Sequence, residues 1–151
     1  MMLTTKARYA VTAMIDIAVL EIERGNKPVK LSEISARHDI ALNYLEQIFA
    51  KLKAGGLVSS VKGPGGGYVI SNGANHTRVL DIIDAVEEQL EMTKCVSHVA
   101  GGCAPDRAKC ATHDLWEGLE KQIRNYLKSK TLADLANQGQ SSKVKGLSNF
   151  L

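Results

Sequence analysis

Three cysteines and one histidine lie close together in the second half of the chain. Cys95, Cys103 and Cys110, which are all of the cysteines, fall within sixteen residues, and His113 follows three positions after the last of them. Thiolates are soft anionic ligands, and neutral imidazole is a common nitrogen ligand for iron and zinc. Cysteines are also common packing residues, but packing cysteines would not gather in one stretch rich in glycine and polar residues. The pattern therefore predicts a metal or iron–sulfur site with these four residues as ligands.

The spacing of these residues favours iron–sulfur over zinc. Cys110 and His113 stand three positions apart, so both side chains can reach one metal if a helix starts there. The other gaps are long, with seven residues between Cys95 and Cys103 and six between Cys103 and Cys110. Structural zinc sites favour short ligand pairs at both ends, whereas a 2Fe–2S cluster distributes four ligands over two irons and tolerates a longer loop. An imidazole ligand makes such a cluster less negative and raises its potential.

Composition predicts an ordinary soluble chain. It has 151 residues, of which 44% are hydrophobic and 23% charged, which suits one domain or one small domain with an appended arm. An odd number of cysteines cannot all pair within one monomer, and no secretory context is evident. The apolar run at residues 9–22 is interrupted by Asp16 and is too short to span a bilayer. We therefore expect a cytoplasmic protein with reduced thiols and no membrane association.

Three helices are predicted in the first sixty residues. Thr4 and Thr5 can cap a helix that the Gly25–Pro28 segment ends. Ser32 is expected to be the N-cap of a short second helix. A third helix runs from about Leu42 to Lys53 and stops at a glycine pair.

The third helix has one apolar and one polar side, as in a helix–turn–helix. Its apolar positions repeat at helical spacing; they are Leu45, Ile48, Phe49 and Leu52. The opposite side presents polar residues together with Ala50; the polar ones are Asn43, Glu46, Gln47 and Lys51. In a helix–turn–helix, the first residues of the second helix reach base edges in the major groove. Amides can bond adenine and a carboxylate can accept from cytosine N4. An ordinary amphipathic helix is the alternative for this segment alone.

A β-hairpin with a basic, glycine-rich tip is predicted directly after that helix. Strand-like runs at residues 57–61 and 68–71 flank the segment 62–67. Gly63, Gly65 and Gly66 would let backbone N–H groups approach phosphate oxygens, and Lys62 adds a positive charge there or in the minor groove. A nucleotide-binding loop is disfavoured because no Lys-Ser/Thr pair follows. The first 62 residues also carry nine Lys/Arg against six Asp/Glu. Residues 1–75 are therefore interpreted as a winged helix–turn–helix that binds double-stranded DNA.

Residues 76–137 are predicted to hold the ligand loop and a dimerisation helix. Thr77 is expected to cap a helix whose apolar positions are Val79, Ile82, Ile83, Val86 and Leu90. After the cysteines, a long helix to about Lys130 repeats apolar residues at threes and fours; these are Leu115, Leu119, Ile123, Tyr126 and Leu127. So few elements cannot bury both sides of that helix, so we expect a homodimer reading a palindromic operator; a helix folded back on its own domain is the alternative. Thr131 should cap a last short helix before a flexible tail at residues 138–151.

Three segments carry a resemblance to a known family. LTTKARYAVTAMIDIA, YLEQIFAKLKAGGLVSSVKGPGGGYVI and CATHDLW closely resemble IscR-type iron–sulfur cluster regulators, which are bacterial homodimeric winged-helix transcription factors. The resemblance covers about residues 2–137. It implies a 2Fe–2S cluster on the four ligand residues named above, and a DNA-reading surface formed by Asn43, Tyr44, Glu46 and Gln47, with Lys62 and its glycines as the wing.

The resemblance also implies a mode of regulation. In the family, the cluster-loaded protein represses the genes for cluster biogenesis, and the cluster-free form still binds a second class of sites. Glu46 resembles the residue that sets this difference. Lys62 stands where arginine is common, which removes bidentate guanine recognition, and the cysteine loop is three residues longer than is usual.

Three other functions remain open from the sequence. One is a nitric-oxide or redox sensor of the same fold, although such relatives lack the histidine found here as His113. A second is a zinc-stabilised, non-sensing DNA-binding protein. A third is an electron-transfer protein, which the wing disfavours. No catalytic constellation is evident, so an enzyme is not expected.

Overall fold

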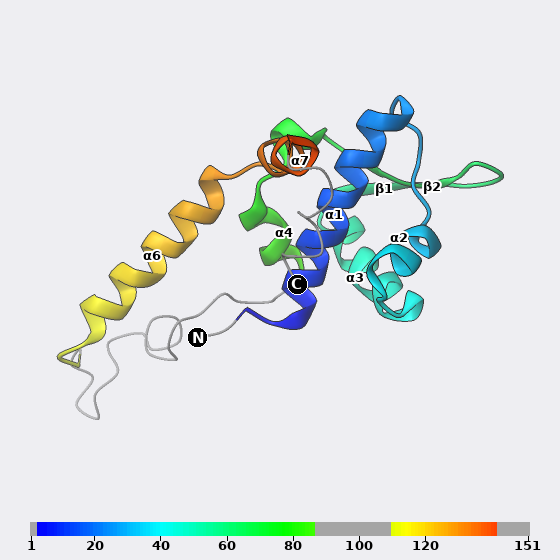
Figure 1. The fold of residues 1–151 in the computed structure, drawn as a ribbon. Coiled ribbons are helices and arrows are strands. Elements are labelled where there is room, and N and C mark those ends of the chain that lie inside the picture. The colour runs from blue at the N-terminus through cyan, green and yellow to red at the C-terminus, as the bar shows by residue number, and fades with distance from the viewer. Residues whose placement is uncertain (1–2, 87–109, 142–151) are drawn as a thin grey trace.

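The computed structural model describes residues 3–86 and 110–141, which form helices and one antiparallel hairpin (Figure 1). This architecture confirms the predicted fold class, a mainly α protein with a small β-hairpin. In chain order the elements are α1 (Thr5–Arg24), α2 (Leu31–His38), α3 (Leu42–Ala54), β1 (Val58–Val61), β2 (Gly67–Ile70), the 3-10 helix η1 (Ala74–His76), α4 (Val79–Val86), α6 (His113–Ser129) and α7 (Leu132–Ser141).

Helix α1 is the element around which the others pack. Thr4 is its N-cap, as predicted, because its hydroxyl accepts a 3.1 Å hydrogen bond from the Ala7 N–H. Gly25 ends the helix in the left-handed conformation, with φ of 69°. Helices α3, α4 and α7 and strand β2 all contact α1, so most of its side chains from Ala10 to Leu20 are buried.

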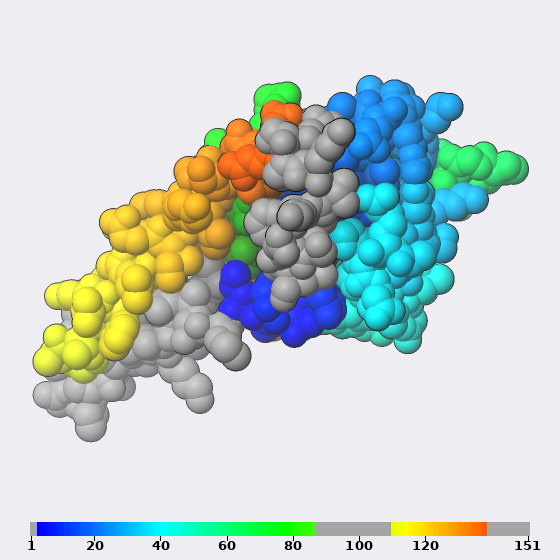
Figure 2. Space-filling model, in the orientation of Figure 1, coloured from blue at the N-terminus to red at the C-terminus, as the bar shows by residue number. Residues whose placement is uncertain are grey.

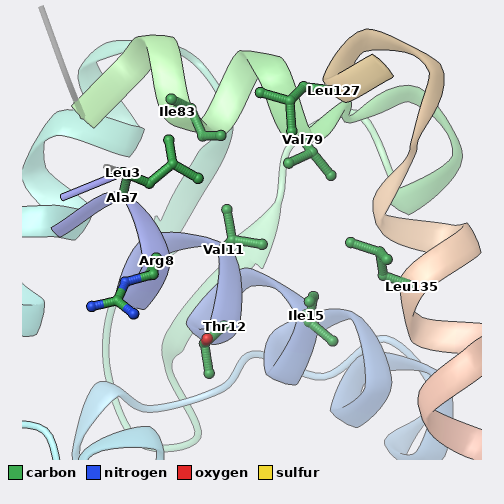
Figure 3. A pocket seen from close by; sticks show the side chains of 10 residues that line it. All are labelled: Leu3, Ala7, Arg8, Val11, Thr12, Ile15, Val79, Ile83, Leu127 and Leu135. Carbon is green, nitrogen blue, oxygen red and sulfur yellow. The ribbon is translucent and has the colours of Figure 1, made fainter. Parts of the chain in front are cut away.

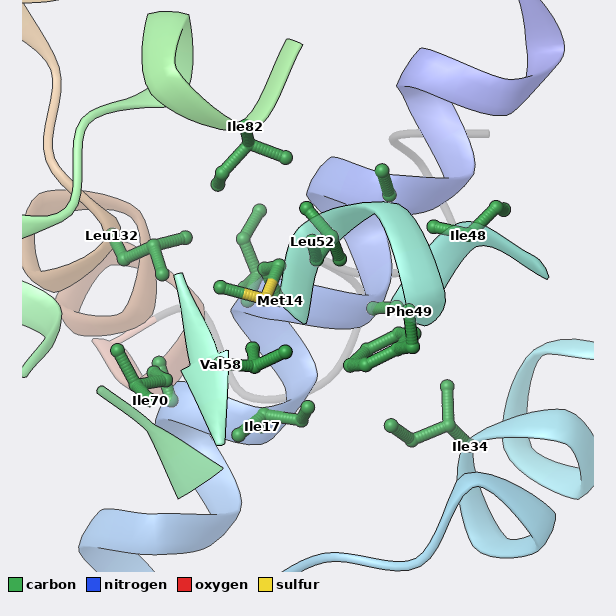
Figure 4. Close-up of a cluster of buried hydrophobic side chains, with 14 of the residues drawn as sticks. Met14, Ile17, Ile34, Ile48, Phe49, Leu52, Val58, Ile70, Ile82 and Leu132 are labelled. Carbon is green, nitrogen blue, oxygen red and sulfur yellow. The ribbon is translucent and has the colours of Figure 1, made fainter. Parts of the chain in front are cut away.

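One hydrophobic core joins the two halves of the chain. Figure 4 shows side chains from α1, α3, the hairpin, α4 and α7 meeting in it. Phe49 of α3 and Leu132 of α7 both have no exposed surface. The predicted boundary at residue 75 therefore does not separate two cores. The assignment of DNA binding to one side of it and ligand binding to the other stays a prediction.

Two predicted helix caps are wrong. Helix α2 begins at Leu31 with Lys30 as its N-cap, and Ser32 is the second residue inside the helix. The N-cap lies two residues earlier because Leu31 is buried in the core, which draws it into the first turn. Thr77 does not cap α4 either, since its hydroxyl donates to the Gly73 carbonyl. The Arg78 N–H is instead accepted by Asp81.

Helix α6 extends away from the other elements (Figures 1 and 2). It begins at His113 and ends at Ser129, close to the predicted limits. Thr131 then caps α7 as predicted: its hydroxyl accepts from the Asp134 N–H, and Asp134 accepts from the Thr131 N–H. Helix α7 continues to Ser141, past the predicted start of the tail at residue 138. Within residues 3–86 and 110–141, no helix combines the length and apolar character needed to cross a bilayer.

Candidate DNA interface and metal site

The polar side of α3 faces solvent as predicted. Asn43, Glu46, Gln47 and Lys51 are exposed, while Leu45, Ile48, Phe49 and Leu52 have no exposed surface. Tyr44, predicted to lie on the DNA-reading surface, is half-buried because its ring packs edge-on against Tyr9 with centroids 6.0 Å apart. No side chain caps the N-terminus of α3, where Ala41 is the N-cap. Helix N-termini attract phosphates, so this end of α3 suits a DNA backbone.

A buried carboxylate fixes α2 against α1. Asp16 of α1 has no exposed side-chain surface, and its two oxygens each accept a 2.9 Å hydrogen bond from the Arg37 guanidinium. His38 Nε2 lies 3.2 Å from the same carboxylate, although its alignment is too poor for it to count as a hydrogen bond by geometry. Since α2 and α3 pack on each other, this cluster also sets where the reading surface lies.

The charged state of Asp16 is favoured in the fold. Burial raises the pKa of this carboxyl, but its contacts with His38 and Arg37 outweigh burial and hold the pKa below its ordinary value. The two Arg37 hydrogen bonds have good geometry, so we assign most of the effect to that guanidinium. The Asp16–Arg37 pair is a bidentate ion pair with one fully buried partner, the type that fixes orientation.

The hairpin is held to the helices at its base. The Ile70 N–H donates a 2.8 Å hydrogen bond to Glu21 of α1, and burial raises the pKa of Glu21 despite that bond. Tyr68 pairs with Val29 through two backbone hydrogen bonds, and its ring packs against Phe49 with centroids 5.0 Å apart. The base of the wing is therefore rigid relative to α3, while its tip extends outward in Figure 1.

The wing glycines divide into two kinds. A Cβ on Gly66 would lie 2.2 Å from the Val61 carbonyl oxygen, and one on Gly67 would lie 2.4 Å from the Val29 carbonyl oxygen, so the chain's own packing requires both. Gly63 and Gly65 have φ of 93° and 76° and meet nothing within 4 Å. Of the three glycines predicted to contact DNA, Gly63 and Gly65 are exposed with Lys62, whereas Gly66 is buried.

Two of the four predicted metal ligands lie in one turn that leads into α6, which begins at His113. The His113 N–H donates to the Cys110 carbonyl at 3.1 Å, which forms a turn, and Cys110 Sγ lies 3.7 Å from the Thr112 hydroxyl. Cys110 is half-buried and His113 is 8% exposed. Cys95 and Cys103 lie outside the described residues. A thiol and an imidazole one turn apart suit an iron ligand pair.

Two carboxylates lie close to His113, and the sequence did not predict them as part of the site. Atoms of His113, Asp114 and Glu117 that could bind a metal all lie within 4.8 Å of one another, and both acids are exposed. Their positions one and four after the histidine in a helix were the available signal.

Helix α4 connects the ligand-bearing helix to the reading helix. Arg124 of α6 pairs with Asp84 of α4 at 3.1 Å, and the Arg78 guanidinium donates to the Lys128 carbonyl at 3.1 Å. On its other side α4 packs on α3, where a Cβ on Gly55 would be only 3.2 Å from the Ala85 Cβ. The C-terminal half of α6 and helix α3 are therefore linked through α4, which packs directly on both.

An apolar cavity of about 150 Å³ lies where α1, α4, α6 and α7 meet (Figure 3). Leu127 and Leu135 close one side of it, opposite Val11 and Ile15 of α1. Only Arg8 and Thr12 contribute polar atoms to its side-chain lining. The packing between α6 and the rest of the molecule is therefore less complete than the core in Figure 4.

Comparison with known proteins identifies the family. A family model described as Rrf2, iron-dependent transcriptional regulator, matches residues 3–138. The chain belongs to the Rrf2 family. Its relatives include proteins named HTH-type transcriptional regulator IscR from Klebsiella pneumoniae and Escherichia coli, each 46% identical over 97% of this chain and 86% of the relative.

Solved Rrf2-type structures have the same fold. T. potens IscR superposes with a TM-score of 0.75 and 32% identity, covering 95% of this chain and 92% of that one. CymR, described as the global cysteine regulator of B. subtilis, also gives 0.75, with 31% identity over 91% of this chain and 98% of its own. This Rrf2 protein is a DNA-binding transcriptional regulator with a winged helix–turn–helix.

Proposed function

We propose that this Rrf2 regulator acts in the cytoplasm as a homodimer and senses iron–sulfur status through a 2Fe–2S cluster. Cys95, Cys103, Cys110 and His113 are its ligands. The dimer binds palindromic operators and controls genes for iron–sulfur cluster biogenesis, mainly as a repressor. The observation that carries this proposal is the placement of Cys110 and His113 where the chain enters α6. The C-terminal half of α6 packs on α4, which in turn packs on the reading helix α3.

The long gaps between the four ligands in the sequence favour a cluster over a structural zinc. When bound, a 2Fe–2S cluster supplies a centre that forms or is lost with iron and sulfide supply. Cys110 and His113 would hold one side of it, and the start of α6 would move or stiffen with occupancy. The relatives named IscR support this interpretation. In such a site iron would compete with protons for the His113 imidazole, so retention of the cluster should weaken in acid.

The exposed side of α6 supports the homodimer. Leu115 and Tyr126 expose 61% and 64% of their surface, and Leu119 exposes 40%. At 100° per residue these three lie within about 40° of one another on the helix, whereas Ile123 and Leu127 turn toward the core. An apolar stripe on an extended helix is a natural surface for a second copy of the same helix.

DNA binding under two cluster states tests the proposal. The full chain, purified without oxygen, is used to select duplexes from a random library, once loaded and once after removal of the cluster. We expect two classes of selected site. Cys110→Ser should lose binding to the first class and retain binding to the second, because α2, α3 and the wing do not depend on that thiol.

The matched control is Thr112→Ser, which keeps a hydroxyl beside Cys110 and should behave as the wild type. A Cys110→Ser variant that remains folded but binds neither class would show that the ligand segment serves DNA binding directly and does not act as a sensor.

A further inference from the structure

Two large apolar side chains are exposed beside the polar reading surface. Leu42, the first residue of α3, is 39% exposed, and Val61, the last residue of β1, is 44% exposed. Both line one groove of about 370 Å³ between the start of α3, the start of α2 and the tip end of the wing. A single exposed leucine needs no explanation, but two apolar residues facing one groove on this side of the molecule do.

The groove also contains one of the predicted base-reading residues. Glu46, one turn after Leu42 on the same side of α3, lines it, and Lys30 adds a positive charge at the start of α2. Leu42 lies between the buried side of the helix and the polar side that holds Asn43 and Gln47. The groove therefore continues the DNA-reading surface toward the wing.

The chemistry of the groove matches one feature of a base edge. The C5 methyl of thymine is the apolar group that base pairs present in the major groove. In DNA this methyl lies at the outer edge of the major groove, near the backbone of its own strand. A side chain on the wing side of a recognition helix therefore meets it first. The Glu46 carboxylate next to it can accept from the N4 amino group of cytosine.

We propose that Leu42 reads the methyl group of a thymine in each half-site, with Val61 forming the opposite side of the groove. The inference rests on the proposed DNA binding and adds a specificity-determining residue to it. It predicts a thymine at one fixed position of every selected half-site.

Removing only the methyl group tests this contact. In a duplex selected by the wild-type protein, each thymine is replaced in turn by deoxyuracil in both half-sites, and affinity is measured by fluorescence anisotropy. One replacement should weaken binding by about fourfold per half-site, the effect of one buried carbon group. The Leu42→Ala protein should bind the thymine duplex more weakly than the wild type does. It should bind the deoxyuracil duplex as well as the wild type does. Leu42→Met, which keeps an apolar side chain of similar size, should retain the preference.

Ile22→Ala is the control, since Ile22 is also an exposed apolar residue, 53% exposed, but lies on α1 outside the groove. It should leave the thymine preference unchanged. Equal weakening of both duplexes by Leu42→Ala would overturn the inference, because the leucine would then contact deoxyribose or support the fold. Wild-type binding that no deoxyuracil replacement affects would also overturn it while leaving the proposed function intact. A wild-type protein that selects no duplex from the library would contradict both the inference and the proposed function.

Discussion

The reading surface of α3 and the ligand-bearing end of α6 are supported in different ways. Four side chains of α3 itself have no exposed surface. Asp16 and Glu21 of α1 bind α2 and the wing, respectively, through hydrogen bonds. Helix α6 instead exposes an apolar stripe and meets the other helices beside an unfilled cavity. The comparison indicates that the packing of this chain alone supports the reading surface, whereas the exposed stripe of α6 is where the proposed second copy would bind. Regulatory elements are commonly the less stable part of a molecule.

The largest expected effect comes from a charge placed in the exposed stripe of α6. Leu119→Glu would bury a carboxylate twice in the proposed dimer contact, at a cost of about 4 kcal/mol. The dimer dissociation constant should therefore rise roughly a thousandfold, measured by sedimentation velocity.

Lys121→Glu is the control for that variant. It introduces the same side chain two positions away, on the opposite side of the helix, where Lys121 is exposed. A Leu119→Glu protein that dimerises like the control would place the dimer contact elsewhere.

An intermediate effect is expected in the unit that reads DNA. Asp16→Asn removes the charge that Arg37 and His38 contact and should lower the free energy of unfolding by about 2 kcal/mol, measured by urea denaturation. The DNA affinity of the remaining folded protein should fall with it, since α2 loses its fixed orientation. Glu33→Gln, which breaks the exposed pair with Arg24, should change stability little.

The effect of Asp16 also has a defined pH dependence. The pKa of Asp16 is lower in the folded state than in the unfolded state, so its contribution is complete above the unfolded pKa of about 3.9 and is lost as pH falls through the folded pKa. Wild type and Asp16→Asn should therefore converge in stability below about pH 4. A constant difference down to pH 2 would contradict the assignment.

The buried and exposed sides of a helix were predicted from the periodicity of its apolar residues. Contacts between residues far apart in the sequence were not predicted. The periodicity of α3 predicted which side is buried and which carries Asn43, Glu46 and Gln47. Asp16 looked only like an interruption in an apolar run, because Arg37 lies 21 positions away and no local pattern reports that pairing. The groove that joins Leu42 to Val61 likewise exists only after the wing folds back toward α3.

Predictions from local sequence preferences were also wrong where tertiary packing determined the structure. Ser32 is a good capping residue, but burial of Leu31 moved the start of α2 ahead of it. Gly63, Gly65 and Gly66 were predicted to approach DNA, whereas the structure shows that the turn itself requires Gly66 to be a glycine. Cys110 and His113 share one turn before and at the start of α6, and the grouping of the four ligands stays a prediction.

The smallest effect is expected at the connection between the two regions. Arg124→Gln breaks a partly exposed pair with Asp84, so stability should fall by less than about 1 kcal/mol. The ratio of DNA affinities with and without cluster should nevertheless fall by about twofold, since α4 transmits the position of α6. Lys128→Gln is the control, because it removes the same charge but keeps the Lys128 backbone carbonyl that accepts from Arg78. It should leave that ratio unchanged.

Iron and sulfide content tests the central claim most directly. The full chain, purified without oxygen, should be reddish and contain about two irons and two acid-labile sulfides per chain, and Cys110→Ser should contain neither. A colourless wild-type protein with one zinc per chain would contradict the account.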